Sequence, residues 1–287
     1  MHLPPPAAAV AALFFLTIAA APGALFFPSA ISAASISPCG EVVRCMVDNG
    51  YYLVKAPKDW DGHTPLAAMV FFHGYRESAE YVMADQSFKD FADAHQILLV
   101  VPHGLGETWS FPGSPRQNRD EFAFVDSVLK DVKGRFPIDS RRLWAAGFSQ
   151  GGSMVWNLAC YRGSSFAAFA PISGAFWMPM PLNCPGGPVN LRHIHGMDDP
   201  TVPMKGRAIG TSFAQGDVRQ SFAPLIANDR CKAEPDRIEM KDGQRCEEWT
   251  HCGTGKNLNL CLHDGGHFVD RNHLEASWRW VESLGKD

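Results

Sequence analysis

The chain has 287 residues, of which 46% are hydrophobic, and its formal net charge is −4 at pH 7. This length is enough for one large α/β domain or two smaller domains. Lys and Arg are scattered and form no basic run, which argues against a nucleic-acid-binding protein and against binding to a membrane surface.

The N-terminal segment differs from the rest of the chain. Residues 7–21 are almost wholly apolar, and small residues follow at Ala24 and at residues 32–34. The run is shorter than the about 20 residues of a membrane-spanning helix and is typical of a signal-peptide core. No Lys or Arg precedes it, and an uncleaved anchor is the alternative. We expect residues 1–35 to be a signal peptide and the protein to be secreted, to the periplasm or the extracellular space.

Eight cysteines agree with export, because an even number behind a leader indicates disulfides formed in an oxidising compartment. We expect Cys39 to pair with Cys45 and Cys160 with Cys184, and the remaining four to pair among themselves. These four are Cys231, Cys246, Cys252 and Cys261. A metal site is the alternative at Cys246, His251, Cys252, Cys261 and His263, but the spacing does not repeat a C-x2-C pattern. We therefore expect no metal.

Predicted strands and helices alternate along the chain after the leader. The run at 67–72 is continuously apolar, as in a strand buried on both faces of a parallel sheet, whereas 51–56 alternates loosely and predicts an antiparallel edge strand. The remaining predicted elements are helix 78–95, strand 97–101, loop 104–119, helix 119–136, strand 143–148, helix 152–161, strand 167–172, strand 189–194, helix 217–227, strand 237–240, strand 258–262 and helix 272–284. This alternation predicts a mostly parallel sheet with helices on both faces, without a second domain.

A G-x-S-x-G motif lies between a predicted strand and a predicted helix. It reads Gly147-Phe148-Ser149-Gln150-Gly151. A strand, a sharp turn and a helix form the setting of a nucleophile elbow, in which the glycines let the backbone pass close to the serine. The motif therefore predicts Ser149 as a nucleophile.

A serine nucleophile needs a histidine base and an acid that holds the histidine, and on this kind of fold they follow in the order serine, acid, histidine. Asp199 follows one later predicted strand, and His267 follows another on a glycine-rich turn. Asp198 and His263 are the competing candidates. We expect a catalytic triad of Ser149, Asp199 and His267.

Two backbone amides should stabilise the negative charge that develops on the substrate oxygen. One is the amide of Gln150, directly after the nucleophile, and the other is that of Tyr75, in the turn after strand 67–72. Trp109 and Trp177 are candidates for aromatic walls of a substrate pocket, with packing in the core or in a loop as the alternative role of each.

Together these motifs resemble the secreted poly(3-hydroxybutyrate) depolymerases and feruloyl or acetylxylan esterases related to carbohydrate esterase family 1. The segments that carry the resemblance are His73-Gly74, Asp139 to Gly152, His195-Gly196 with Asp199, Gly265-Gly266-His267, the cysteines at 160 and 184, and residues 228–231. The match covers about residues 45–285 and implies an α/β-hydrolase fold with one catalytic domain over residues 36–287. Relatives often continue the last motif with a tryptophan, whereas Phe268 follows here, so we place Phe268 in the substrate pocket.

The resemblance implies a secreted, cofactor-independent serine esterase that acts on phenolic or acetyl (feruloyl-type) esters through an acyl-enzyme. The alternative substrate is poly(3-hydroxybutyrate) or its oligomers. A second alternative is a non-catalytic binding protein on a hydrolase scaffold, which the intact triad disfavours. A serine peptidase is disfavoured because it would carry a propeller or a lid domain. We expect a small-molecule or polymer-derived ester as the substrate, with no nucleic acid and no stable membrane association after removal of the leader; the sequence leaves the oligomeric state open.

Overall fold

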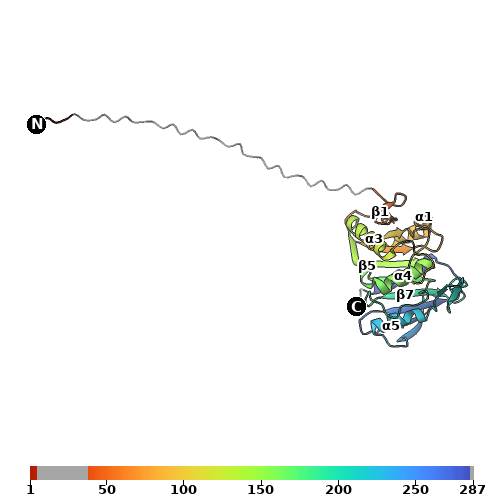
Figure 1. Cartoon of the computed structure of the whole chain (residues 1–287). Helices are drawn as coiled ribbons and strands as arrows, with labels where there is room; N and C mark the ends of the chain where they lie inside the picture. The colour runs from red at the N-terminus through yellow and green to blue at the C-terminus, as the bar shows by residue number, and fades with distance from the viewer. Residues whose placement is uncertain (5–37, 285–287) are drawn as a thin grey trace. The chain divides into compact units, whose positions relative to one another are not determined.

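The protein is built on one mixed sheet of ten strands, in the order β1-β2-β4-β3-β5-β6-β7-β12-β11-β10 (Figure 1). The computed structural model describes residues 1–4 and 38–284. The predicted leader, residues 1–35, lies outside the described residues apart from its first four, so it stays a prediction. Contacts between residues divide the chain into units at 1–35 and 36–287, and the sheet belongs to the second unit.

The centre of the sheet is parallel and buried. Strands β4, β3, β5, β6, β7 and β12 run parallel, while β1 and β2 at one end and β11 and β10 at the other pair antiparallel. Every residue of β3, β4 and β7 is buried. Strands β3 and β4 are apolar runs of the kind that can be covered on both faces, whereas β7 also buries Arg192, His193 and His195. The strands are β1 (Cys45–Val47), β2 (Gly50–Lys55), β3 (Leu66–Phe72), β4 (Ile97–Pro102), β5 (Ile138–Phe148), β6 (Ala168–Ile172), β7 (Leu191–Gly196), β10 (Arg237–Lys241), β11 (Gln244–Trp249) and β12 (Leu258–His263).

Helices cover both faces of the sheet. Residues of α3, α4 and α5 pack in one apolar cluster, and residues of α1, α2 and α6 pack in a second cluster. The predicted mostly parallel sheet with helices on both faces is thereby confirmed. The helices are α1 (Ala79–Ala84), α2 (Gln86–Ala94), α3 (Glu121–Arg135), α4 (Gln150–Tyr161), α5 (Ala223–Asp229) and α6 (Arg271–Ser283), with 3-10 turns at Gly163–Ser165 and Gln220–Phe222.

Three details differ from the sequence prediction. The predicted helix 78–95 is two helices, because the Asp85 carboxylate accepts a hydrogen bond from the Ser87 amide and starts α2. The predicted edge strand pairs on both sides, since β1 lies outside β2. Strand β11 and a small separate hairpin, β8 (Arg207–Ile209) with β9 (Phe213–Gln215), were not predicted.

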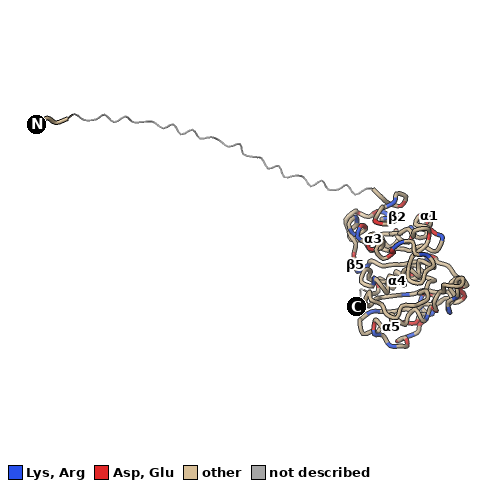
Figure 2. Tube along the Cα trace, in the orientation of Figure 1, with Lys and Arg blue, Asp and Glu red and all other residues tan. Residues whose placement is uncertain are grey.

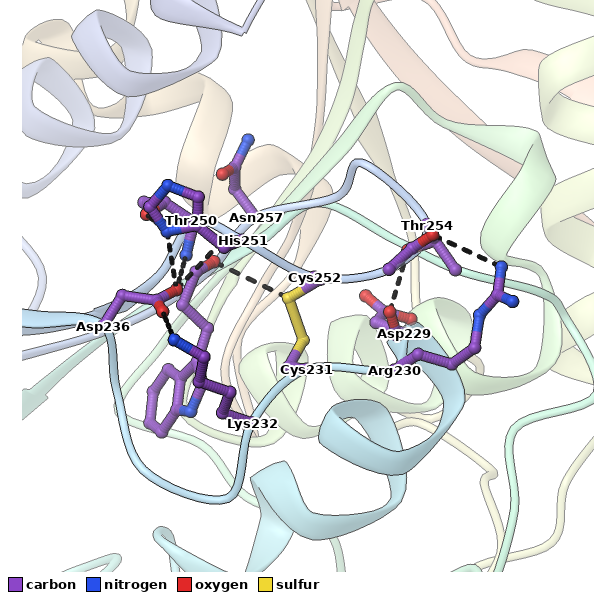
Figure 3. Close-up of a disulfide and its surroundings, with 12 residues drawn as sticks. Asp229, Arg230, Cys231, Lys232, Asp236, Thr250, His251, Cys252, Thr254 and Asn257 are labelled. Carbon is purple, nitrogen blue, oxygen red and sulfur yellow. Dashed lines mark hydrogen bonds and ion pairs between the residues drawn. A yellow bond between two sulfur atoms is a disulfide. The ribbon is translucent and has the colours of Figure 1, made fainter.

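All eight cysteines form disulfides. The predicted pairs Cys39–Cys45 and Cys160–Cys184 are confirmed, and the last four pair among themselves as expected. Cys231–Cys252 joins the chain after α5 to the loop before β12 (Figure 3). In the same region the Asp236 carboxylate accepts hydrogen bonds from the amides of Thr250 and His251. Cys246–Cys261 links β11 to β12. Cysteines in disulfides offer no thiolate to a metal, and the described residues contain no group of three or more His, Cys, Asp or Glu that could hold one.

Charge is mixed over the described fold. Figure 2 shows Lys and Arg interspersed with Asp and Glu along the chain. Within residues 1–4 and 38–284, no helix has both the length and the apolar character needed to cross a membrane.

Candidate active site

Ser149 lies at the turn between β5 and α4, in a backbone conformation that side chains rarely adopt (φ 57°, ψ −119°). Such a conformation costs about 1–3 kcal/mol and persists only where the surroundings impose it. Here packing imposes it. A Cβ on Gly151 would overlap the carbonyl oxygens of Phe72 and His73 at the end of β3, and a Cβ on Gly147 would lie 2.6 Å from the Gly151 carbonyl oxygen. The motif glycines thus let β3, β5 and α4 meet behind the serine.

Three side chains from distant parts of the chain form a continuous hydrogen-bonded row. His267 Nε2 lies 2.9 Å from Ser149 Oγ, and His267 Nδ1 lies 2.7 Å from Asp199 Oδ2. Ser149 follows β5, Asp199 follows β7 and His267 follows β12, so the row gathers at the carboxyl ends of parallel strands. The Phe148 ring packs against the His267 imidazole, with the ring centres 4.7 Å apart.

The Asp199 carboxylate is buried, with 4% of the residue exposed. Its second oxygen accepts hydrogen bonds of 2.8 Å from each of the amides of Thr201 and Val202. Burial alone would raise the pKa of Asp199, but the hydrogen bonds from His267 and the two amides outweigh it, and the pKa lies below its usual value. A carboxylate held in this way is ionised at neutral pH and fixes the His267 ring.

Asp198 and His263, the competing candidates, lie outside this row. The Asp198 side chain is exposed. The His263 ring packs against Phe268 and His273, with ring centres 5.2 and 4.9 Å away. Neither side chain contacts Ser149, so the geometry favours Asp199 and His267.

The backbone amides of Gln150 and Tyr75 are the predicted oxyanion donors. Gln150 is the first residue of α4, where the helix dipole favours negative charge. Within the described residues, neither amide donates a hydrogen bond to another group. Both residues line the pocket that contains Ser149. Two amides without a partner beside a serine can bind an oxyanion.

The turn that carries Tyr75 is held from both sides. Glu77 accepts a hydrogen bond of 2.8 Å from the Gly74 amide. The buried His73 ring lies 2.8 Å, at Nδ1, from the Gly74 carbonyl oxygen and accepts a hydrogen bond of 2.9 Å from the Gly104 amide at Nε2. Burial lowers the pKa of His73 to about 4, so the ring is neutral and its Nε2 is an acceptor at neutral pH. This anchoring fixes the position of the Tyr75 amide.

A pocket of about 360 Å³ opens at the serine. Its lining combines the elbow with the loop after β4, the β8–β9 hairpin and one tryptophan. The residues are Tyr75, Thr108, Pro115, Arg116, Ser149, Gln150, Ser153, Trp177, Thr201, Arg207, Ile209 and Gln215. Four of these were predicted as site residues from the sequence, and the other eight were not. For most of the eight the fold alone brings their segments to the serine, whereas Ser153 lies one helical turn after it on α4.

The three predicted pocket residues occupy different places. Trp177 lines the pocket. Trp109 is fully buried, and its indole N–H donates a hydrogen bond of 2.8 Å to the His73 carbonyl oxygen, which places it beneath the oxyanion turn and outside the pocket lining. Phe268 is 41% exposed and packs on His263, also outside the lining. The alternative role of Trp109, packing in a loop, fits its position.

Several curated proteins resemble the chain in sequence, although no protein-family model matches it. A probable feruloyl esterase C of Aspergillus niger is 26% identical over 226 residues, which are 75% of each chain. Feruloyl esterase C of Emericella nidulans is 28% identical over 223 residues, again 75% of each. The putative esterase NocK of Nocardia uniformis is 33% identical over 224 residues, 71% of this chain and 64% of that one.

Solved structures agree on the fold. An acetyl xylan esterase from Aspergillus awamori superposes with a TM-score of 0.61 at 13% identity and covers 82% of this chain and 94% of its own. A phospholipase/carboxylesterase from Dyadobacter fermentans reaches 0.54 at 13% identity, over 80% and 95%. The sequence relatives confirm the resemblance drawn from the motifs. By its relatives and its fold, the chain is a carboxylic ester hydrolase with an α/β-hydrolase fold, similar in sequence to the feruloyl esterases.

Proposed function

We propose that the protein is a secreted serine esterase that hydrolyses phenolic or acetyl (feruloyl-type) esters through an acyl-enzyme formed on Ser149. The observation that carries the proposal is the hydrogen-bonded row of Ser149, His267 and Asp199, which opens into a pocket beside two unpartnered amides. The names of the fungal relatives support the feruloyl class.

In this mechanism Ser149 Oγ attacks the ester carbonyl carbon while His267 Nε2 takes the hydroxyl proton. The Asp199 carboxylate stabilises the imidazolium, and the amides of Gln150 and Tyr75 hold the oxyanion. The intermediate collapses with cleavage of the bond to the alcohol, which leaves with the proton from His267. Water then attacks the acyl-enzyme by the same route and releases the acid and Ser149.

The proposal includes export. Residues 1–35 would be a leader, and residues 36–287 would be one catalytic domain. Four disulfides support an oxidising compartment, where such bonds persist. N-terminal sequencing of the protein recovered from its native culture medium tests this part, and an intact Met1 would contradict it.

Replacement of the nucleophile tests the mechanism. Ser149→Ala should lower kcat by a factor on the order of 10⁶ on p-nitrophenyl acetate, methyl ferulate or hydroxybutyrate oligomers, because the triad acts as a unit. Ser140→Ala is the matched control, since Ser140 is exposed and lies in the same strand, near its opposite end. A folded Ser149→Ala protein that keeps most of its activity would refute the mechanism. A folded wild type that turns over none of these esters would favour a binding protein.

A further inference from the structure

The pocket at Ser149 has an unbalanced charge. Its lining includes Arg116 and Arg207 and contains no Asp or Glu. Arg116 belongs to the loop between β4 and α3, and Arg207 belongs to β8. Neither the acyl transfer chemistry nor the oxyanion amides require a cation at these positions, so the two arginines are left without a role in the mechanism above.

Both arginines also lack a carboxylate partner. Among the arginines of the described residues, those without an ion pair are Arg76, Arg116, Arg207 and Arg230. Arg76 follows Tyr75 and lies over its ring, with the guanidinium carbon 5.2 Å from the ring centre. Three of these four side chains therefore gather at or beside one pocket, although elsewhere in the fold an arginine is usually balanced by an acid.

The segments that carry the two pocket arginines are fixed. Arg207 Nε donates a hydrogen bond of 3.1 Å to Gln215 Oε1, and Gln215 is buried between β8 and Trp177. The terminal Nη groups of Arg207 are left without a partner in the described residues. The Arg116 carbonyl oxygen accepts a hydrogen bond of 2.8 Å from the buried Ser114 hydroxyl, while the Arg116 guanidinium has no partner in the described part of the chain.

The acid of the catalytic row and the acid of the oxyanion turn are already bound to other groups. The Asp199 carboxylate is already bound by His267 and by the amides of Thr201 and Val202. The Glu77 carboxylate is bound to the Gly74 amide, and it does not line the pocket. Both arginines are exposed, and an anionic group on a substrate in this pocket would meet two guanidinium groups that have no acid partner among the described residues.

We propose that Arg116 and Arg207 select esters that carry a free carboxylate in their acyl or alcohol part, such as monoesters of dicarboxylic acids or hydroxy acid oligomers with a free acid end. Guanidinium groups bind carboxylates by charge-assisted and often bidentate hydrogen bonds, more strongly than they bind neutral groups. The inference rests on the proposed function, because it concerns the substrate of the same serine.

The test compares pairs of esters that differ only in charge. Monoethyl adipate carries the carboxylate on the acyl side and 6-acetoxyhexanoate carries it on the alcohol side; the neutral partner of each has a primary amide in its place. We expect wild-type kcat/KM to favour one charged ester over its amide by about 5- to 10-fold at low salt, and the ratio to fall towards 1 at about 1 M NaCl. In Arg116→Gln/Arg207→Gln the ratio should be near 1 at every salt concentration.

Arg141→Gln is the matched control, since Arg141 is exposed in the first half of β5, whereas Ser149 follows its end. It should keep the wild-type ratio. Wild-type turnover of each amide as fast as its acid would overturn the selection while leaving the esterase intact. Equal losses on acid and amide in the double variant would also overturn it, because they would indicate a structural role. Absence of turnover of all four esters and of p-nitrophenyl acetate would instead refute the proposed function.

Discussion

Replacement of Asp199 by asparagine tests how the acid acts on the histidine. The carboxylate accepts three hydrogen bonds, from the amides of Thr201 and Val202 on one oxygen and from His267 Nδ1 on the other. Asparagine has one acceptor oxygen and one NH₂ donor. If the NH₂ faced the two amides, two N–H groups would point at a donor. The oxygen therefore stays with Thr201 and Val202, and the NH₂ faces His267.

The substitution changes the tautomer of the His267 ring. With a donor opposite Nδ1, that nitrogen becomes the acceptor and the ring proton moves to Nε2, which lies 2.9 Å from Ser149 Oγ. A protonated Nε2 cannot take the serine proton. A triad with the wrong tautomer loses about 10⁴ in kcat, which corresponds to about 5.5 kcal/mol of transition-state stabilisation. The fold should be little affected, because both amides keep their acceptor.

The assay measures kcat and KM of Asp199→Asn on p-nitrophenyl acetate at pH 7.5, together with the free energy of unfolding in urea. Asp198→Asn is the control, since its side chain is exposed and only its backbone amide is used, in a hydrogen bond to the Gly265 carbonyl oxygen. The control should keep wild-type kcat. A folded Asp199→Asn protein with kcat within tenfold of wild type would refute the tautomer reasoning.

Three further changes probe packing, covalent bonding and pH. Gly151→Ala should lower the free energy of unfolding by about 3 kcal/mol or more, because the new Cβ meets two carbonyl oxygens. Gly134→Ala is the control: Gly134 lies in α3 with open space around it, so the change should raise the free energy of unfolding by about 0.5–1 kcal/mol. Urea titrations measure both, and equal effects would contradict this reasoning. Removal of the Cys160–Cys184 disulfide by a double alanine change should cost about 3 kcal/mol in the same titration, and no loss would contradict the chain-entropy account. Because burial lowers the pKa of His73 from 6.5 to about 4, the unfolded chain binds a proton that the folded protein excludes. Stability should fall by up to about 3 kcal/mol as pH drops between these values, and His73→Asn should lose less over that range.

The sequence was most informative where a short apolar run ends in a motif. Strand 143–148, the elbow glycines and the loops at Asp199 and His267 could be placed because each depends on local patterns, and the structure brings Ser149, Asp199 and His267 within hydrogen-bond distance. Their catalytic roles remain proposals.

The sequence was less informative where distant segments decide the structure. Strand β11 contains adjacent Glu247 and Glu248, which look exposed, yet both are buried because Arg219 and Arg237 from other segments bind them. Trp109 looked suited to a pocket wall, but its indole N–H binds a carbonyl oxygen that only the fold brings near. Contacts of this kind have no local signature.

Different parts of the fold carry the catalytic residues and the wall of the substrate pocket. Backbone hydrogen bonds join the loop that carries Asp199 to the end of β12 and the turn that carries His267. The Met197 amide donates to the His263 carbonyl oxygen (2.9 Å), and the Asp198 amide donates to the Gly265 carbonyl oxygen (3.0 Å). Much of the pocket wall comes instead from the loop after β4 and from the β8–β9 hairpin, which lies outside the ten-stranded sheet. Changes in these walls can therefore alter which ester is bound without moving the triad. Substrate selectivity should respond to substitutions in the hairpin and the loop, whereas kcat on a small neutral ester should respond to substitutions at the strand ends.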